Sequence, residues 1–213
     1  MKFQFPKNRL EAFSDGVFAI AITLLVLEIH VPEGEESLAH RLAEIWPQYV
    51  SFVISFFVIG VMWVNHHRML HDIRAVDHGL LICNLVVLMT VTIIPFTTSL
   101  AGEEITHGSF ADERTAAILY ALGFVLFGLA FSLMWWWAAR DRHLLEADVP
   151  EFQIQARLRG MLLGTVLYLG AAAVAFASPL ASLILDGVLA AAFLMPATVM
   201  VKVTGPSPSR RPG

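Results

Sequence analysis

The sequence predicts an all-α, polytopic membrane protein with six transmembrane helices per subunit. Of its 213 residues, 57% are hydrophobic and only 15% are charged, and a soluble domain of this size could not cover that composition with polar surface. The apolar residues gather in six windows of about 20 residues, the length that crosses a hydrocarbon core of about 30 Å. The expected spans are 9–30, 47–68, 77–100, 114–138, 156–177 and 179–201.

Residues that end helices or favour water separate these spans. Pro32 closes the first span, and Arg68 and Arg74 flank the turn after the second. Gly102-Glu103-Glu104 follows the third span, and Ser178-Pro179 forms a tight hairpin between the last two. Proline and glycine are the strongest local breaks in a helical pattern, so these positions set the expected span boundaries.

The chain is expected to form one membrane domain, residues 1–204, and a disordered tail, residues 205–213. The tail reads GPSPSRRPG and has no apolar side chain that could be buried. The apolar stretch after Arg9 is too long for the hydrophobic region of a signal peptide, so it is expected to remain as the first span. The single cysteine, Cys83, is expected to be a small core residue.

The distribution of basic residues predicts the orientation. Twelve of the 14 Lys and Arg residues fall on the side of the two termini, and only Arg41 and Arg114 fall on the other. By the positive-inside rule both termini are expected in the cytoplasm. The run Trp135-Trp136-Trp137 before Arg140 is expected to form an aromatic belt at the cytoplasmic interface.

The first span carries an acid that needs a partner. Arg9, Ser14 and Asp15 lie in its first two turns, and an ionisable group facing lipid is costly, so Asp15 is expected to be functional or to organise an oligomer. Arg9 and Asp15 lie about 120° apart around the helix and are poorly placed to pair. The polar groups available on the second and third spans are Trp63, Asn65, His66, His67, His78 and Asn84.

The pattern Arg9-x-x-x-Phe13-Ser14-Asp15 resembles the signature of the transmembrane protein 175 family of endosomal and lysosomal potassium channels, in its bacterial single-repeat form. The end of the second span and two segments of the third are also similar to the family pattern: Trp63-Val64-Asn65-His66-His67-Arg68, Asn84-Leu85 and Ile94-Pro95-Phe96. Animal members carry two six-span repeats, whereas this chain has one signature. The resemblance therefore implies a homotetramer around one pore, in a bacterial cytoplasmic (inner) membrane.

The resemblance also implies a role for the signature residues. Arg9, Phe13, Ser14 and Asp15 would position the pore helix, not touch ions. They would do so through a network with polar groups of the next two spans, namely Trp63, Asn65, His66, His67 and Asn84.

A stripe of apolar side chains follows the signature along the first span. At about 100° per residue, Ile20, Leu24 and Leu27 lie within a narrow sector, with Thr23 at its edge. Such a stripe is typical of helix packing, but the resemblance implies that it lines the pore. Ile20 would then form the constriction, Leu24 and Leu27 the next apolar rings, and Thr23 a polar ring. The chain has no TVGYG-like filter, so modest selectivity for potassium over sodium is expected.

Two other functions are open at this point. A secondary cation or proton transporter would show helices broken near the membrane midplane, for which Pro95 is the one candidate. A metal-dependent membrane enzyme could use the cluster of His66, His67, His71 and His78 with Asp72 and Asp77. That cluster sits in a short loop beside Arg68 and Arg74, without a second histidine-rich cluster to complete a two-metal site.

The prediction is therefore a channel and not an enzyme. Its expected partners are potassium ions, the lipid bilayer and three further copies of the chain, with no cofactor and no nucleic acid. Asp186 in the sixth span has no identifiable partner in the sequence and is expected near the hairpin, in reach of water.

Overall fold

A computed structural model describes residues 6–140 and 142–194 of the chain, with the backbone alone at residues 106, 107, 193 and 194. The described chain is helical, as predicted. Its elements are α1 (Lys7–Leu24), the 3-10 turn η1 (Leu25–Glu28), α2 (Leu38–Glu44), α3 (Trp46–His71), α4 (His78–His107), α5 (Phe110–Arg140), α6 (Glu151–Val174) and α7 (Pro179–Leu194). The predicted tail at 205–213 lies outside the described residues.

Five helical segments are long and apolar enough to cross a bilayer, and they correspond to the first five predicted spans: Lys7–Glu28, Trp46–His71, His78–Ile105, Phe110–Arg140 and Glu151–Val174. The predicted sixth span corresponds to α7, which is apolar and 16 residues long. The remainder of that predicted span, 195–201, lies outside the described residues. The count of six membrane crossings therefore stays a prediction.

The helix α4 is longer than predicted. Gly102, Glu103 and Glu104 lie inside it, not after it, because an α-helix satisfies its own backbone hydrogen bonds and can continue past the hydrocarbon core. Pro95 also lies inside α4. The hydroxyls of Thr97 and Thr98 lie 3.1 and 2.7 Å from the Ile94 carbonyl, and the Thr98 hydroxyl also lies 2.7 Å from Ser55 Oγ of α3.

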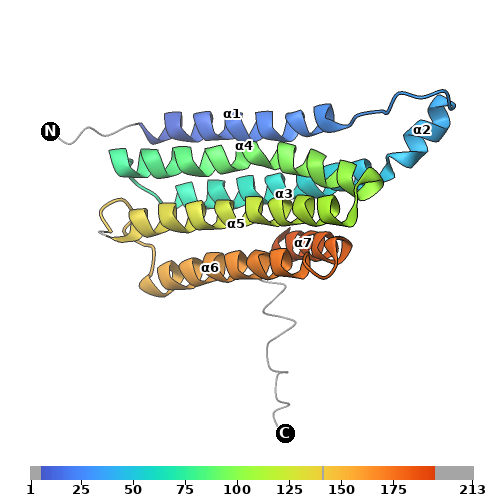
Figure 1. Ribbon diagram of the computed structural model, residues 1–213. Coiled ribbons are helices and arrows are strands. Elements are labelled where there is room, and N and C mark those ends of the chain that lie inside the picture. The colour runs from blue at the N-terminus through green and yellow to red at the C-terminus, as the bar shows by residue number, and fades with distance from the viewer. Residues whose placement is uncertain (1–5, 141, 195–213) are drawn as a thin grey trace, which may run out of the picture.

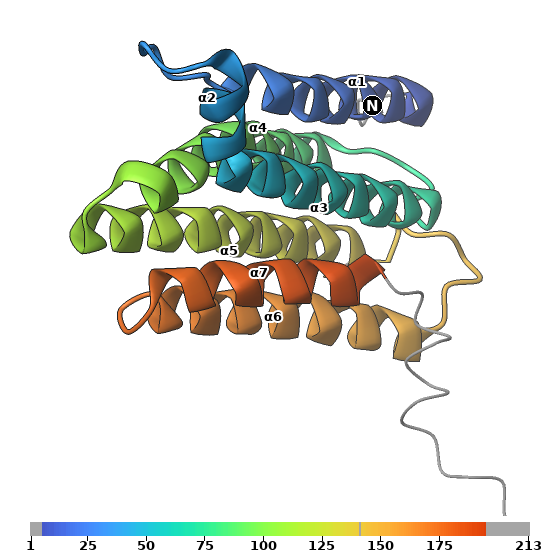
Figure 2. The same ribbon diagram turned by 90° about the vertical axis from the view of Figure 1, so that its right-hand side faces the viewer.

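The helices form a layered bundle (Figure 1). At one edge lies α1, at the opposite edge lie α6 and α7, and α3, α4 and α5 fill the space between them. The same order is visible in the second view (Figure 2). The contacts agree with it, because α1 packs on α3 and α4 while α5 packs on α4, α6 and α7. One face of α1 consequently has no neighbouring helix among the described elements.

A short helix between α1 and α3 was not predicted. Ser37 begins α2 by accepting a hydrogen bond from the His40 backbone N–H at 3.3 Å. His40 then lies between Glu36 and Glu44 on the exposed surface, with its Nε2 2.9 and 3.2 Å from their carboxylates. The segment is too short and too polar to give a hydropathy signal.

The loops α3–α4 and α5–α6 pack on each other at one end of the bundle. The Arg74 backbone N–H donates to the Leu144 carbonyl at 2.8 Å, and the Glu146 N–H donates to the Asp72 carbonyl at 3.0 Å. The Asp72 carboxylate pairs with Arg157 of α6 at 2.6 Å. This end of the bundle is therefore held by contacts between segments far apart in the sequence.

The three consecutive tryptophans do not form a uniform interfacial belt. Trp135 is buried in the bundle and donates its Nε1–H to the Ile154 carbonyl at 3.1 Å. Trp137 is half-buried and donates to the Asp77 carboxylate at 3.2 Å, whereas Trp136 is exposed. The belt prediction is wrong for Trp135, because consecutive residues of a helix point in different directions and one of them faces the core.

Candidate pore helix and its anchoring network

The helix α1 has one buried and one exposed face. Its buried residues recur at helical spacing and pack against α3 and α4; they are Leu10, Ser14, Phe18 and Ala21. Leu25 of the 3-10 turn continues this face. The signature serine therefore lies on the side of α1 that contacts the rest of the subunit.

Asn84 of α4 is the centre of a buried hydrogen-bond network that joins three helices. Its Nδ2–H donates to the Ser14 Oγ of α1 at 3.0 Å. Its Oδ1 lies 2.7 Å from Nε2 of His66 on α3, and because an amide oxygen only accepts, the imidazole Nε2–H is the donor. Ser14, His66 and Asn84 are fully buried. The network fixes the rotation of α1 against α3 and α4.

The imidazole of His66 is also packed between aromatic rings. Its centroid lies 5.3 Å from the Phe18 ring of α1 and 6.4 Å from the Phe131 ring of α5. The second ring nitrogen, Nδ1, is buried and has no hydrogen-bond partner among the described residues. His66 is thus held by one hydrogen bond and by ring packing.

Asp15 is bound by the second helix-to-helix contact of the signature. The Trp63 indole N–H of α3 donates to Asp15 Oδ1 at 2.7 Å, and His67 lies beside the Trp63 ring at a centroid distance of 6.0 Å. Asp15 is half-buried and Trp63 is exposed, so this contact lies at the margin of the bundle. It supports the sequence-based idea that Asp15 needs a partner on a neighbouring helix.

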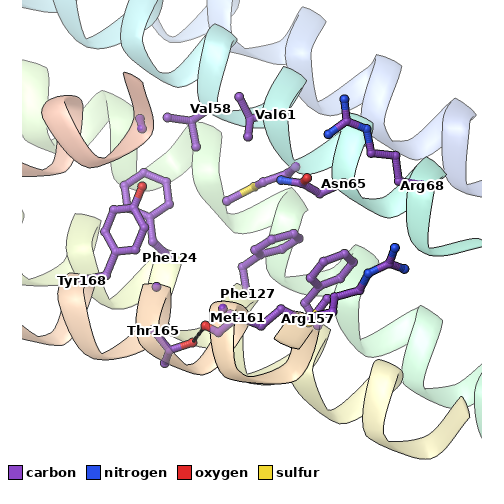
Figure 3. A pocket seen from close by; sticks show the side chains of 16 residues that line it. Val58, Val61, Asn65, Arg68, Phe124, Phe127, Arg157, Met161, Thr165 and Tyr168 are labelled. Atoms are coloured by element: carbon purple, nitrogen blue, oxygen red, sulfur yellow. Dashed lines mark hydrogen bonds between the residues drawn. The ribbon is translucent and has the colours of Figure 1, made fainter. Parts of the chain in front are cut away.

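Four of the residues expected in the network take no part in these hydrogen bonds. Arg9 and Phe13 are exposed on α1, and His67 is exposed on α3 beside Trp63. Asn65 points elsewhere, into a cavity between α3 and α6 (Figure 3). The structure therefore separates the signature: Ser14 and Asp15 contact α4 and α3, while Arg9 and Phe13 lie on the other face.

The apolar stripe of α1 lies on this exposed face. Ile20 and Leu27 are 60% and 68% exposed, and Leu24 is exposed as well. Thr23 is exposed, and its hydroxyl donates to the Ile20 carbonyl at 2.9 Å. Ile22, on the opposite side, is half-buried and packs against the core. Among the described residues, the stripe that sequence reasoning singled out thus lies on the exposed side of α1.

The sequence contained a further signal that went unused. Arg9, Phe13 and Gly16 precede Ile20 at spacings of four and three residues, which places them on the same face of α1. All three are exposed. Arg9 and Phe13 therefore extend the Ile20 stripe toward the start of the helix. Sequence reasoning had instead placed these two residues in the anchoring network.

The histidine cluster does not form a metal site. His66 is buried and bonded to Asn84, whereas His71 and His78 are exposed. The Nδ1 atom of His71 lies 3.5 Å from Oδ1 of Asp72. Within residues 6–140 and 142–194, the one group of three residues with metal-ligand spacing is Glu36, His40 and Glu44 on α2, at the other end of α3. The described residues of the histidine cluster thus provide no group of three with metal-ligand spacing.

Asp186 of α7 does not reach water as expected. The residue is fully buried, and neither of its carboxylate oxygens has a hydrogen-bond partner among the described residues. Its position on the helix that follows the Ser178-Pro179 hairpin had suggested that Asp186 reaches water. In the structure α7 packs against α3, α5 and α6, and this packing buries the Asp186 side chain.

The fold and this site define an integral membrane protein whose first helix is anchored on one side and free on the other. Residues 9–95 match the family described as the endosomal/lysosomal potassium channel TMEM175. The chain is also 41% identical over 185 residues to a potassium channel of Streptomyces collinus, covering 86% of this chain and 89% of that one. The chain belongs to the TMEM175 family of ion channels.

The similarity extends to solved structures and to animal proteins. A lysosomal potassium-selective channel TMEM175 homolog from Chamaesiphon minutus has 42% identity and a TM-score of 0.77, with 88% of this chain and 95% of that chain covered. The human endosomal/lysosomal proton channel TMEM175 is 26% identical over 200 residues, which is 92% of this chain and 36% of the human one. The family to which the chain belongs is thus a family of membrane channels, not of enzymes.

Proposed function

We propose that the protein is a potassium channel that assembles as a homotetramer, with α1 of each subunit lining a central pore. The observation that carries this proposal is the free apolar face of α1, which continues from Phe13 to Leu27 at the edge of the bundle. The relatives from Streptomyces collinus and Chamaesiphon minutus are named potassium channels, which supports potassium as the permeant ion.

The two faces of α1 suit a pore helix. A pore helix must keep one face toward the pore, which requires a fixed rotation against the rest of the subunit. Here a buried network and the Asp15 contact with Trp63 fix the rotation of α1, and this fixes which residues are free. Four copies arranged with their free faces inward would place Ile20, Leu24 and Leu27 in successive rings.

Such rings would form a hydrophobic gate. A narrow apolar neck excludes the water that accompanies an ion, so conduction requires the neck to widen. Ile20 would be the narrowest ring, and Thr23 would add hydroxyls between the apolar rings. Because no carbonyl filter is available, selectivity for potassium over sodium would rest on the cost of partial dehydration and would be modest.

Proton conduction is the second candidate. The vertebrate relatives are named proton channels, among them the human and chicken proteins. A transporter is disfavoured because α4 continues without a break through Pro95, the one position that had suggested a broken helix. Flux through reconstituted liposomes, compared for potassium, sodium and protons, separates these functions.

The orientation proposed for the subunit places both termini in the cytoplasm. Most of the described basic residues gather at the loop end of the bundle, where α3 ends and α6 begins, among them Arg68, Arg74, Arg142 and Arg157. Arg41 and Arg114 lie at the other end, in α2 and at the start of α5. The positive-inside rule assigns this end to the cytoplasmic side of a bacterial inner membrane.

The pore assignment is tested by replacing Ile20 with asparagine. Four amides at the constriction would hydrate the neck, so basal cation conductance is expected to rise and potassium over sodium discrimination to fall. Ile22→Asn is the matched control, because Ile22 is half-buried against the core and its replacement should lower stability without opening a pore. Unchanged conductance and selectivity in an assembled Ile20→Asn channel would remove Ile20 from the pore.

A further inference from the structure

A cavity of about 440 Å³ lies between α3, α5, α6 and α7, on the side of the bundle away from α1. Figure 3 shows its lining. The volume falls within the range of about 300–1,000 Å³ that ligand pockets occupy. The anchoring network and the proposed pore face do not use this cavity.

The body of the cavity is apolar and aromatic. Its walls include Phe124 and Phe127 of α5, Met62 of α3 and Met161 of α6. Phenylalanine and methionine side chains give an adaptable apolar lining, which suits a flexible hydrocarbon chain. Gly160 of α6 also borders the cavity, and a Cβ added there would meet no atom within 4 Å. The cavity is therefore not closed at this point.

One end of the cavity carries two arginines, Arg68 and Arg157 (Figure 3). Arg157 is held in place because it pairs with Asp72 at 2.6 Å and lies over the Trp135 ring at 4.5 Å. Arg68 is exposed, and its guanidinium has no hydrogen-bond or ion-pair partner within the described part of the chain. The two arginines and Asp72 sum to one positive charge.

The depth of the two arginines matches a lipid head group. Arg68 lies three residues before the end of α3 and Arg157 six residues after the start of α6, about 5 and 9 Å along the helix axes at 1.5 Å per residue. The helices α6 and α7 expose large apolar side chains to their surroundings, among them Leu163, Val166 and Ile184. The cavity therefore opens where acyl chains and phosphates of one leaflet are found.

We propose that this cavity binds an anionic phospholipid, with one acyl chain between α3, α5 and α6 and the phosphate at Arg68 and Arg157. A phosphodiester carries one negative charge and accepts hydrogen bonds from guanidinium groups, so it matches the net charge of the site. Basic pockets between transmembrane helices on the cytoplasmic side suit such head groups. The lipid would join α6 and α7 to α3. That the cavity faces lipid rests on the proposed function, in which α1 faces the pore.

The test measures lipid binding directly, so it is separate from any test of conduction. The purified protein in detergent is titrated with phosphatidylglycerol and with phosphatidylcholine of the same acyl chains, and bound lipid is counted by native mass spectrometry. We expect one saturable phosphatidylglycerol per subunit, bound about tenfold more tightly than phosphatidylcholine.

Two pairs of variants locate the site. Gly160→Leu places a side chain at the cavity and should abolish the saturable binding, whereas Gly170→Leu adds the same side chain at an exposed α6 glycine with equal free space and should not. Arg68→Gln should weaken binding about tenfold, and Arg159→Gln, exposed on α6 outside the cavity, should leave it unchanged.

Several results would overturn the proposal. Equal binding of the two phospholipids would show that the head-group charge is not recognised. Gly160→Leu and Arg68→Gln behaving like their controls would place the lipid elsewhere. Binding of oleate in place of phosphatidylglycerol would identify a fatty-acid site, and a changed oligomeric mass of Gly160→Leu would identify a contact between copies of the chain.

Discussion

Replacing Asn84 with leucine tests the network that fixes α1. Leucine has the same branched arrangement of heavy atoms as asparagine, so the change removes the polar contacts, while its two bulkier methyl groups add some overpacking at this fully buried position. Two short hydrogen bonds disappear, the one to Ser14 at 3.0 Å and the one from His66 at 2.7 Å, together with the longer 3.4 Å contact from the Ser14 hydroxyl to Asn84 Oδ1. Both former partners are fully buried, so water cannot replace the lost bonds. His66 would be left with neither ring nitrogen bonded.

The magnitude follows from the number of groups left without a partner. Each buried polar group that loses its hydrogen bond costs about 1–3 kcal/mol in soluble proteins, whereas hydrogen bonds between membrane helices contribute about 0.6 kcal/mol on average and at most about 1.7 kcal/mol. Two bonds therefore bracket the expected loss of unfolding free energy at about 1–4 kcal/mol. The loss should favour separation of α1 from α3 and α4.

The assay is reversible unfolding in mixed micelles with increasing sodium dodecyl sulfate, followed by tryptophan fluorescence. Thr90→Val is the matched control, because Thr90 is also buried on α4 but its hydroxyl bonds only to the Val87 carbonyl of the same helix. A double-mutant cycle with Ser14→Ala isolates the contact between α1 and α4. A coupling energy of zero, together with Asn84→Leu being as stable as Thr90→Val, would refute the reasoning.

Three further outcomes are expected. Asp15→Asn keeps an oxygen that can accept from the Trp63 indole but removes the charge, so it should weaken assembly or gating mildly, by about 1 kcal/mol. Asp15→Leu also removes the acceptor and should have the larger effect. If the size-exclusion yield and the ion flux of both variants match those of the parent, Asp15 has no organising role. Gly79→Ala should lower the free energy of unfolding by about 1–3 kcal/mol, because the added Cβ would overlap the Trp137 ring. Gly60→Ala is the control, because a Cβ at Gly60 meets no atom within 4 Å. Equal unfolding midpoints for the two variants would contradict the close approach of Gly79 to Trp137. Reporter fusions at the C-terminus and in the α4–α5 loop should report opposite compartments, with the C-terminus cytoplasmic, and a periplasmic C-terminus would break the six-span prediction.

The sequence by itself determined the fold class and the approximate positions of the helices. The reason is that a bilayer imposes one simple requirement, an apolar run of fixed length with internally satisfied backbone groups, and this requirement is local. The signature around Asp15 and the apolar stripe from Ile20 to Leu27 were also visible, because helical spacing places residues on a common face without any knowledge of the neighbours. Polar segments outside the bilayer, such as α2, gave no comparable signal.

Only the tertiary structure decided which polar groups meet. The sequence offered several partners for the first span, but Asn84 and His66 lie in the network and Asn65 and His67 do not. Adjacent residues of a helix differ by about 100° in direction, so His66 and His67 cannot both face Asn84. Their roles depend on the rotation of α3, which the packing of α1, α4 and α5 sets.

The same reason explains the tryptophan run, the buried acid and the cavity. Trp135 and Asp186 are buried because their directions on α5 and α7 meet other helices. The cavity with Arg68 and Arg157 exists only where α3 and α6, separated by most of the chain, approach each other. Hydropathy and spacing describe one helix at a time, whereas the contacts between helices are properties of the assembled bundle.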